Sequence, residues 1–304
     1  MKSPILFLFF SILVGQLTAQ SDSGNVAKPL VIEDITKAMS KGTQPGFRID
    51  IPQVKKKGTV EALSKAMKAE SRANLEQVNN EYIVRGTTIK SISPRPLNVY
   101  GIVNEYEDHV ELLFFYEADS AFLSKEKNET EYLSARKYTR DFAVQAYRGA
   151  VQERIDLENS KLKDLQSQLD GLNSEQDKLK KTIDAENQNI EKTRQKIATS
   201  EKDQERVGKL VQDQKALVDQ ARSSKNEGLE KEEQKKLNGF ESDLSKLAKQ
   251  EDGYHKEITN SEENIREYKR TSSDNDGASQ VKQEDVAKQK DLINKLQKRL
   301  ESIQ

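Results

Sequence analysis

The chain has 304 residues, of which 33% are charged and only 34% are hydrophobic. Globular domains usually hold about 45–50% apolar residues and glycine, so one large core is excluded. Lys and Arg number 50 against 51 Asp and Glu, which excludes a uniformly basic nucleic-acid binder and a uniformly acidic tail. The chain has no Cys, no Trp and two His, so disulfides, thiol nucleophiles and Cys-based metal sites are excluded.

The first residues have the order of a secretory signal peptide. Lys2 precedes an apolar run from Pro4 to Val14, and small residues surround Ala19. This run of 11 residues is shorter than the ~18–20 apolar residues that span a bilayer. We therefore expect a cleaved signal peptide over 1–19 and a flexible segment over 20–30; the alternative is an uncleaved anchor.

The expected cellular location of the mature chain follows from this segment and from the absence of cysteine. No Cys follows the apolar run, which excludes a bacterial lipid anchor, and no later segment is apolar enough to cross a membrane. The protein is therefore expected to be periplasmic or secreted, with no transmembrane segment in the mature chain. Without disulfides, its stability must come from packing.

Residues 31–135 have the composition of a small head domain. All six prolines and most aromatic and β-branched residues fall before residue 135. The segment 47–51 alternates apolar and polar residues, which predicts a half-buried strand closed by Pro52. Thr59 then precedes apolar residues at helical spacing, so a short helix with Thr59 as its N-cap is expected next.

Three further β-rich segments complete the head. The first covers 81–89, and the next two, 97–106 and 109–116, flank the turn residues Glu107 and Asp108, which predicts a hairpin. The last segment is apolar on both faces, as is typical of a central strand. We therefore expect an α+β fold, in which a β-α-β-β-β head domain is followed by a long α-helical coiled-coil hairpin.

Few residues have the chemistry of a functional site. The lysine run 55–57 is either a contact for an anionic partner or, as so few charges favour, a solvated turn. His109 lies beside acidic residues at 105–108, a set that favours an exposed turn over a metal site. His255 has no second His at i+4 and supports no triad. There is no phosphate-binding glycine loop either. The sequence thus predicts no catalytic, cofactor-binding or metal-ligating residue, no enzyme and no cofactor.

The strongest pattern is a heptad repeat that fills the second half of the chain. Eight of ten residues at the first core position, a, are apolar, and so are six of eleven at the second, d. Charged residues fill most positions between them, as in a coiled coil. The a series is Ile155, Leu162, Leu169, Gln176, Ile183, Ile190, Ile197, Gln204, Val211 and Val218, and the d series is Val151, Glu158, Leu165, Leu172, Leu179, Glu186, Thr193, Ser200, Val207, Gln214 and Ala221.

The start of this helix has its own signal. Asn128 and Glu131 have the spacing of a capping box. One helix is therefore expected from about Glu129 to Arg222, and at 1.5 Å per residue it would be roughly 140 Å long.

A second heptad frame follows an interruption. It places Leu237 and Leu244 at a, with Phe240 and Leu247 at d, and its phase differs from that of the first frame. The polar, glycine-containing segment 223–228 lies between the two frames. This composition predicts the tip of an antiparallel helical hairpin.

The second half therefore divides into arm 1 over 136–222, the tip, arm 2 over 229–270 and its continuation over 280–304. The polar segment 271–279 is expected to break the helix while the heptad phase is kept. Two interpretations of this break stay open, a hinge and a disordered segment.

Four polar residues occupy core positions of the two frames: Glu158, Glu186, Gln204 and Glu251. Residues of this kind fix the register of a coiled coil at a cost in stability, or mark the seam for a further partner. Register is the interpretation that we favour.

Several segments together suggest a relationship. They are FRIDIP at 47–52, NEYIVRGTTIKSIS at 80–93, NVYGIVNEYEDHVELLFFYEADSAFLS at 98–124 and KYTRDFAVQAY at 137–147. With the N-terminal segment and the coil, they resemble an exported, functionally uncharacterised coiled-coil family of Bacteroidota. The resemblance implies a periplasmic or outer-envelope address, and it implies no activity and no functional residue.

Two functions are compatible with these patterns. The first is an exported, non-enzymatic scaffold, spacer or assembly protein of the bacterial cell envelope, with a protein partner or self-association through the coiled coil and no nucleic acid. The alternative is a periplasmic holdase-type chaperone for outer-membrane clients. Holdases of this shape usually carry basic arms, whereas the segments 151–200, 201–250 and 251–304 have net charges of −1, 0 and −2. That balance favours the first function.

Overall fold

The computed structural model describes residues 26–71 and 74–304. The signal peptide expected over 1–19 lies outside the described residues. The chain forms two compact units. The head unit comprises the described residues up to Asn159 together with Asp291–Gln304, and the hairpin unit comprises Ser160–Lys290. The head is thus larger than the segment 31–135, because the start of one long helix and the end of the other pack against its sheet.

The head unit contains one antiparallel sheet and a short helix. The strand order is β1-β2-β6-β5-β4-β3, with β7 paired to β6. The elements are β1 (Ile32–Met39), β2 (Gly42–Pro52), α1 (Lys56–Ser71), β3 (Glu76–Val78), β4 (Glu81–Thr87), β5 (Leu97–Glu105), β6 (His109–Ala118) and β7 (Ala121–Phe122). The expected β-α-β-β-β order is present as β2, α1, β4, β5 and β6. The sequence patterns did not predict β1, β3 and β7.

Strand β6 is the centre of the sheet, as its apolar sequence predicted. It pairs with β2 on one side and β5 on the other, so that Phe114 lies between Phe47 and Gly101. Its residues from Val110 to Ala118 are all buried. A strand covered on both faces lacks the regular alternation of a half-exposed strand, and its two carboxylates, Glu111 and Glu117, are buried as well.

The main core lies on one face of this sheet. Side chains from α1, from the start of the long helix α2 (Glu129–Ser223) and from the end of the long helix α3 (Glu227–Ser302) pack there. Phe114 meets Phe142 of α2 in an edge-to-face contact with ring centroids 5.5 Å apart. Arg148 of α2 donates a hydrogen bond to the carbonyl of Ile303 (3.2 Å). The end of α3 is thereby held against the start of α2.

The opposite face of the sheet carries a smaller apolar cluster, which the β1–β2 hairpin covers. Ile35 and Met39 of β1 pack against this cluster. The hairpin crosses β6 closely at Gly46, where a Cβ atom would lie 2.5 Å from the Phe115 ring and 2.6 Å from the Phe114 carbonyl oxygen. Only glycine fits this crossing without displacement of the backbone.

Two expected helix caps are wrong. Helix α1 begins at Lys56, before Thr59, and its first turn is held instead by Glu105, whose carboxylate accepts from the Lys56 N–H (3.2 Å). Helix α2 begins at Glu129 as expected, but the Asn128 side-chain oxygen has no hydrogen-bond partner among the described residues. Glu131 forms no capping box either, since its carboxylate binds Arg95 and Ser93.

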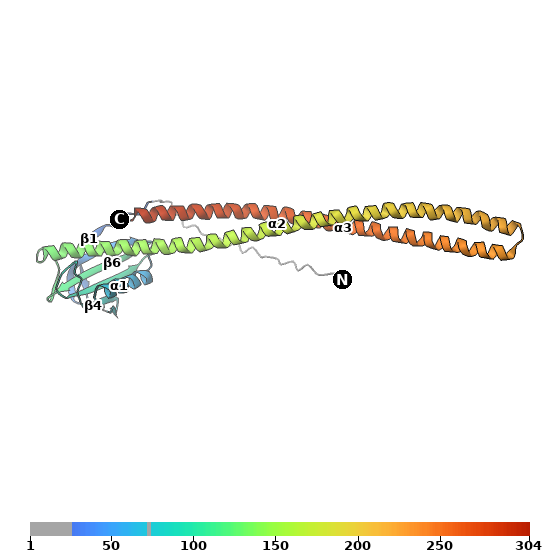
Figure 1. Cartoon of the computed structure of the whole chain (residues 1–304). Helices are drawn as coiled ribbons and strands as arrows, with labels where there is room; N and C mark the ends of the chain where they lie inside the picture. Colours follow the sequence, from blue (N-terminus) through green and yellow to red (C-terminus); the bar gives the residue numbers. More distant parts are fainter. Residues whose placement is uncertain (1–25, 72–73) are drawn as a thin grey trace. The chain divides into compact units, whose positions relative to one another are not determined.

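The helical hairpin itself is confirmed. Helices α2 and α3 run antiparallel and contact each other within the hairpin unit (Figure 1). Three residues, Ser224 to Asn226, connect them. Lys225 takes a left-handed conformation with φ 52°, and the Asn226 side chain accepts a hydrogen bond from the Leu229 N–H (3.2 Å), which caps α3.

The expected break at 271–279 is wrong, because α3 is continuous through this segment. The second heptad frame places Ser272, Asn275 and Ser279 at core positions. The opposite helix provides polar partners for Ser272 and Asn275. Ser272 accepts from Gln176 (2.7 Å), and Asn275 donates to the Leu172 carbonyl (3.3 Å). Composition alone predicted a turn because the partners that satisfy these side chains lie about 100 residues away.

Candidate functional site

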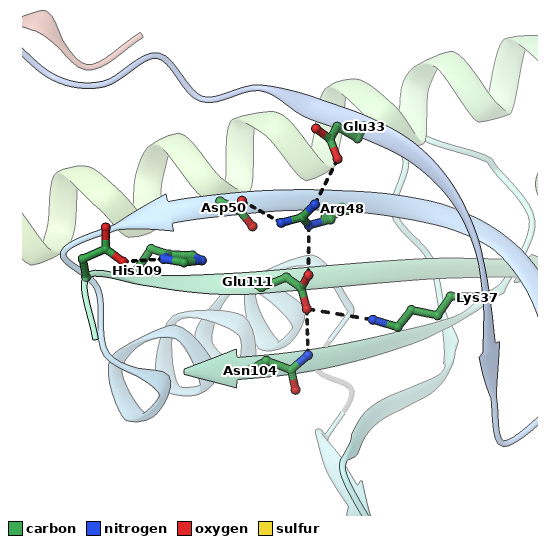
Figure 2. A network of polar contacts seen from close by, with 8 residues as sticks. Glu33, Lys37, Arg48, Asp50, Asn104, His109 and Glu111 are labelled. Carbon is green, nitrogen blue, oxygen red and sulfur yellow. Dashed lines mark hydrogen bonds and ion pairs between the residues drawn. The ribbon is translucent and has the colours of Figure 1, made fainter. Parts of the chain in front are cut away.

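A network of charged side chains lies on the second face of the sheet, beside the β1–β2 hairpin (Figure 2). Its centre is Glu111 of β6, which is only 8% exposed. The Glu111 carboxylate accepts a hydrogen bond from Asn104 of β5 (2.8 Å) and lies 4.0 Å from the Lys37 ammonium of β1. One carboxylate thus connects three strands.

Arg48 of β2 is the second centre of the network. Its guanidinium pairs with Glu33 (3.2 Å) and Asp50 (2.9 Å), while its Nε lies 2.9 Å from Glu111. Burial alone would lower the pKa of Arg48, but the attraction of Asp50, Glu111 and Glu33 outweighs it, so the pKa is raised. The arginine is a permanent cation that ties β1, β2 and β6 together.

A shallow hollow of about 200 Å³ opens beside this network, lined by Arg48, Asp50, Glu33 and the apolar residues Pro29, Val31 and Ile49. Two atoms beside the hollow, the Arg48 Nε and the Asp50 Oδ1, have no hydrogen bond to any described residue. The Arg48 Nε lies close to Glu111, but its N–H does not point at the carboxylate. The hollow therefore suits a water molecule or another small polar group. Its lining includes no nucleophile beside a base.

A second buried carboxylate, Glu117 of β6, is bound in a similar way. It accepts hydrogen bonds from the Tyr100 hydroxyl (2.8 Å) and from the Asn98 amide (3.0 Å). Burial by itself raises the pKa of Glu117, but these two hydrogen bonds and the nearby cations outweigh it, so the pKa is lowered. Because both donors stabilise the ionised form, this group acts as a structural anion.

His109 lies at the β5–β6 turn, where the sequence placed it. Its ring stacks on Tyr106 with centroids 4.7 Å apart, and its Nδ1 lies 2.6 Å from the Asp108 carboxylate. The hydrogen bond from His109 lowers the pKa of Asp108. In residues 26–71 and 74–304 the structure brings together no group of three or more His, Asp or Glu side chains that would hold a metal ion.

The lysine run at 55–57 and the second histidine are largely occupied by neighbouring acids. Lys55 lies 3.5 Å from Glu105, and Lys57 lies 3.9 Å from Glu61. His255 lies 3.8 Å from Glu251 on the surface of α3. These contacts are those of solvated surface charges, whose pairs are weak.

The hairpin unit presents a different candidate, its seam. Core positions of both frames face one another along the unit, and near the tip Val211, Val218, Leu237 and Phe240 form one apolar cluster. Polar core residues of the two helices also pair. Gln214 donates to the Glu233 carboxylate (2.5 Å), and Gln204 donates to Glu251. Glu186 accepts a hydrogen bond (3.3 Å) from Asn264, an exposed residue at position g of the opposite helix.

These pairs decide the role of three of the four polar residues singled out in the sequence. Glu186, Gln204 and Glu251 each find a polar partner on the opposite helix. A shift of the helices by one turn would separate Gln204 from Glu251 and leave both at apolar neighbours, and it would also remove the contact of Glu186 with Asn264. They therefore specify the register of the hairpin within one chain.

Two further seam residues are not satisfied in this way. The hydroxyl groups of Thr193 and Ser200 are buried and have no hydrogen-bond partner within the described part of the chain. Both occupy d positions, where a larger apolar residue would fill the space. Beside Ser200, a groove of about 330 Å³ opens between the helices, with Leu247 and Tyr254 in its wall.

No helix among the described residues is long and apolar enough to cross a membrane. In comparisons with known proteins, no family model, no curated protein and no solved structure matches the chain.

Proposed function

We propose that the protein is an exported, non-enzymatic scaffold, spacer or assembly protein of the bacterial cell envelope. The observation that carries this proposal is the seam of the hairpin unit, in which polar core residues of one helix pair with those of the other, as Gln214 does with Glu233. Two long helices that are held in one register by such pairs form a stiff element suited to spacing or presenting other parts.

The head supports the same proposal. The half-buried Arg48 and the buried Glu111 connect neighbouring strands through their ion pairs and hydrogen bonds. Catalytic side chains usually have a perturbed pKa and remain available to exchange a proton or to bind a ligand. The head therefore has the chemistry of a rigid domain that docks to a partner.

A holdase would need a different surface from the one that the hairpin unit presents. A chaperone that clasps unfolded chains needs open apolar surface between its arms, whereas α2 and α3 bury their core positions against each other. The nearly neutral arms also offer no electrostatic attraction for clients.

Cross-linking in intact envelopes tests the scaffold proposal. We expect purification of the cross-linked protein to recover the same few folded envelope proteins in reproducible ratios. If the purified mature protein instead suppresses aggregation of an unfolded outer-membrane barrel at near-stoichiometric ratios, the holdase function replaces it.

Export is tested separately. The protein isolated from a periplasmic or secreted fraction is expected to begin at Gln20, as N-terminal sequencing would show. A variant without residues 2–19 serves as the control and is expected to stay in the cytosol. Recovery of the full-length chain with Met1 from the cytosol would contradict export.

A further inference from the structure

One face of the hairpin unit carries exposed apolar side chains near the tip. Leu210 (37% exposed) and Leu217 (47%) lie on α2, and Leu229 (42%) lies on α3. All three occupy heptad position g, the position just before a. We call the surface that they form the distal face.

The three leucines share one side because of the pairing geometry. In an antiparallel pair of helices, e positions flank e positions on one side of the seam and g positions flank g positions on the other. The e side is identified by its ion pairs, Lys215 with Glu241 (3.2 Å) and Arg194 with Glu262 (3.9 Å). The g positions therefore lie on the opposite side, where the leucines stand.

The g side of the seam carries exposed apolar side chains, whereas the e side carries ion pairs. Val281, the one other large apolar side chain that is exposed in the described hairpin unit, occupies position c, which also lies on the g side. Near the tip, α2 is apolar at g as well as at a, and α3 adds Leu229 at g, so the apolar stripe is locally wider than a two-helix seam needs. That width is typical of helices in a four-helix bundle.

The charges on the distal face indicate what kind of partner fits. Arg206 pairs with Asp203 (3.2 Å), Lys236 with Glu232 (3.0 Å) and Lys246 with Asp243 (2.9 Å). Because the charges on this face are of both signs and mostly paired within their own helix, the face does not attract a polyanion or a polycation. A surface with the same neutral, leucine-bearing character is the complementary one.

The groove beside Ser200 lies on the same face. Its wall includes Lys196 and Asp203. Both residues occupy position g, Lys196 two heptads before Leu210 and Asp203 one heptad before it. It provides a recess next to the protruding leucines, so the face has both knobs and a hole. Such a surface is complementary to itself when two copies meet.

We propose that a second copy of the hairpin docks on the distal face, so that two hairpins form a four-helix bundle. Three partly exposed leucines are less than the roughly 800 Å² per partner of a standard interface. Because each copy of a symmetric dimer contributes one such patch, the affinity is expected to be modest, with a Kd on the order of 1–100 µM. The inference deepens the proposed scaffold function by naming one of its partners.

The first test is the mass of the mature chain, residues 20–304, by sedimentation over about 1–300 µM, a range that brackets such a Kd. We expect a concentration-dependent dimer. The double variant Leu210→Glu, Leu217→Glu should raise its Kd at least roughly tenfold, since charges would be buried at the interface. Gln212→Glu, on the opposite side of α2, adds a charge away from the face and should leave the dimer unchanged.

The far-UV circular dichroism of all variants should equal that of the wild type, because the substituted side chains lie on the surface. Thermal midpoints should agree at concentrations below the Kd and should be lower for the double variant above it, where the wild type is a dimer. A wild-type chain that stays monomeric over the whole concentration range overturns the proposal. So does a dimer that both variants weaken equally.

A second test locates the interface. The chain has no cysteine, so Leu217→Cys introduces a single thiol on the distal face and Lys215→Cys one on the opposite side. A short bis-maleimide should join two Leu217→Cys chains and should join few Lys215→Cys chains. Equal yields overturn the proposal.

The two proposals fail independently. A monomer that binds an unfolded barrel through the leucines would overturn self-docking and support the holdase function. Loss of every other envelope partner in the cross-linking experiment would contradict the scaffold function and leave the measured dimer as it is.

Discussion

The head unit and the hairpin unit are stabilised in different ways. The largest fully buried side chains, among them Tyr100, Phe114 and Tyr147, all belong to the head. In the hairpin unit, buried residues such as Thr193, Ser200 and Gln214 are small or polar and recur at heptad spacing. The head thus depends on a few large contacts, whereas the hairpin adds many small ones along its seam.

The two units therefore differ in where they tolerate substitution. In the head, removal of one aromatic ring leaves a void among neighbours that are fixed by the sheet. In the hairpin, each side chain contacts few residues of the opposite helix, and the surrounding surface can adjust. The predictions below test this difference, beginning with the largest expected effect.

Phe114→Ala is expected to destabilise the head by about 3–5 kcal/mol, as large-to-small changes at buried aromatics do. Phe114 is 0% exposed and contacts both Tyr116 and Phe142. Near-UV circular dichroism and urea unfolding would measure the loss. A change below about 1 kcal/mol would show that the sheet closes around the void, and would remove the distinction between the two units.

Leu237→Ala makes the matching test in the hairpin. Leu237 is buried with Val211, Val218 and Phe240, but solvent lies close on both sides of the seam. We expect a smaller loss of about 2 kcal/mol, at the low end of the range for leucine. The far-UV signal during urea unfolding would report it. A loss equal to that of Phe114→Ala would contradict the comparison.

Gly46→Ala tests the crossing of β2 over β6. The added Cβ would meet the Phe115 ring and the Phe114 carbonyl, so a loss of about 1–3 kcal/mol is expected from overpacking. Gly171→Ala is the control in the hairpin, since nothing lies within 4 Å of its Cβ position. It should stabilise α2 by about 1 kcal/mol. Thermal midpoints that move in the same direction would refute the assignment of Gly46.

The smallest effect concerns the buried Glu117. Its pKa is lowered in the folded protein, so ionised Glu117 contributes stability above its unfolded pKa of about 4.3, and this contribution is lost as pH falls through the folded pKa. Glu117→Gln should therefore flatten the acid side of the stability profile. Urea midpoints between about pH 3 and 7 would measure this, and an unchanged acid slope would contradict it.

Some elements of the fold could be predicted from the sequence, and others could not. The heptad phase at Val211 and Val218 was readable because helical periodicity is local. The β5–β6 hairpin followed from the turn residues between the two strands, and the central place of β6 from its apolar character on both faces, whereas the pairing of β2 with β6 was not predicted. Strand β1 was missed because its outward residues are polar and its apolar ones face the second cluster only after the hairpin crosses at Gly46.

The charged residues of the head were the least predictable. Nothing in the local sequence joins Arg48 to Glu111, or Tyr100 to Glu117, since these partners meet only when strands pair. The Asn128 and Glu131 spacing was correct as a helix start and wrong as a cap. Arg95, which lies between β4 and β5, offers Glu131 a charged partner in place of the backbone N–H.

The sequence by itself determined the α+β head, the antiparallel helical hairpin and the position of its tip, because these depend on periodicity and turn chemistry within a few residues. Only the tertiary structure decided the continuity of α3 through 271–279, the use of polar core residues as register pairs, and the side on which Leu210, Leu217 and Leu229 gather. Each of these depends on a partner from a distant part of the chain, which no local pattern encodes.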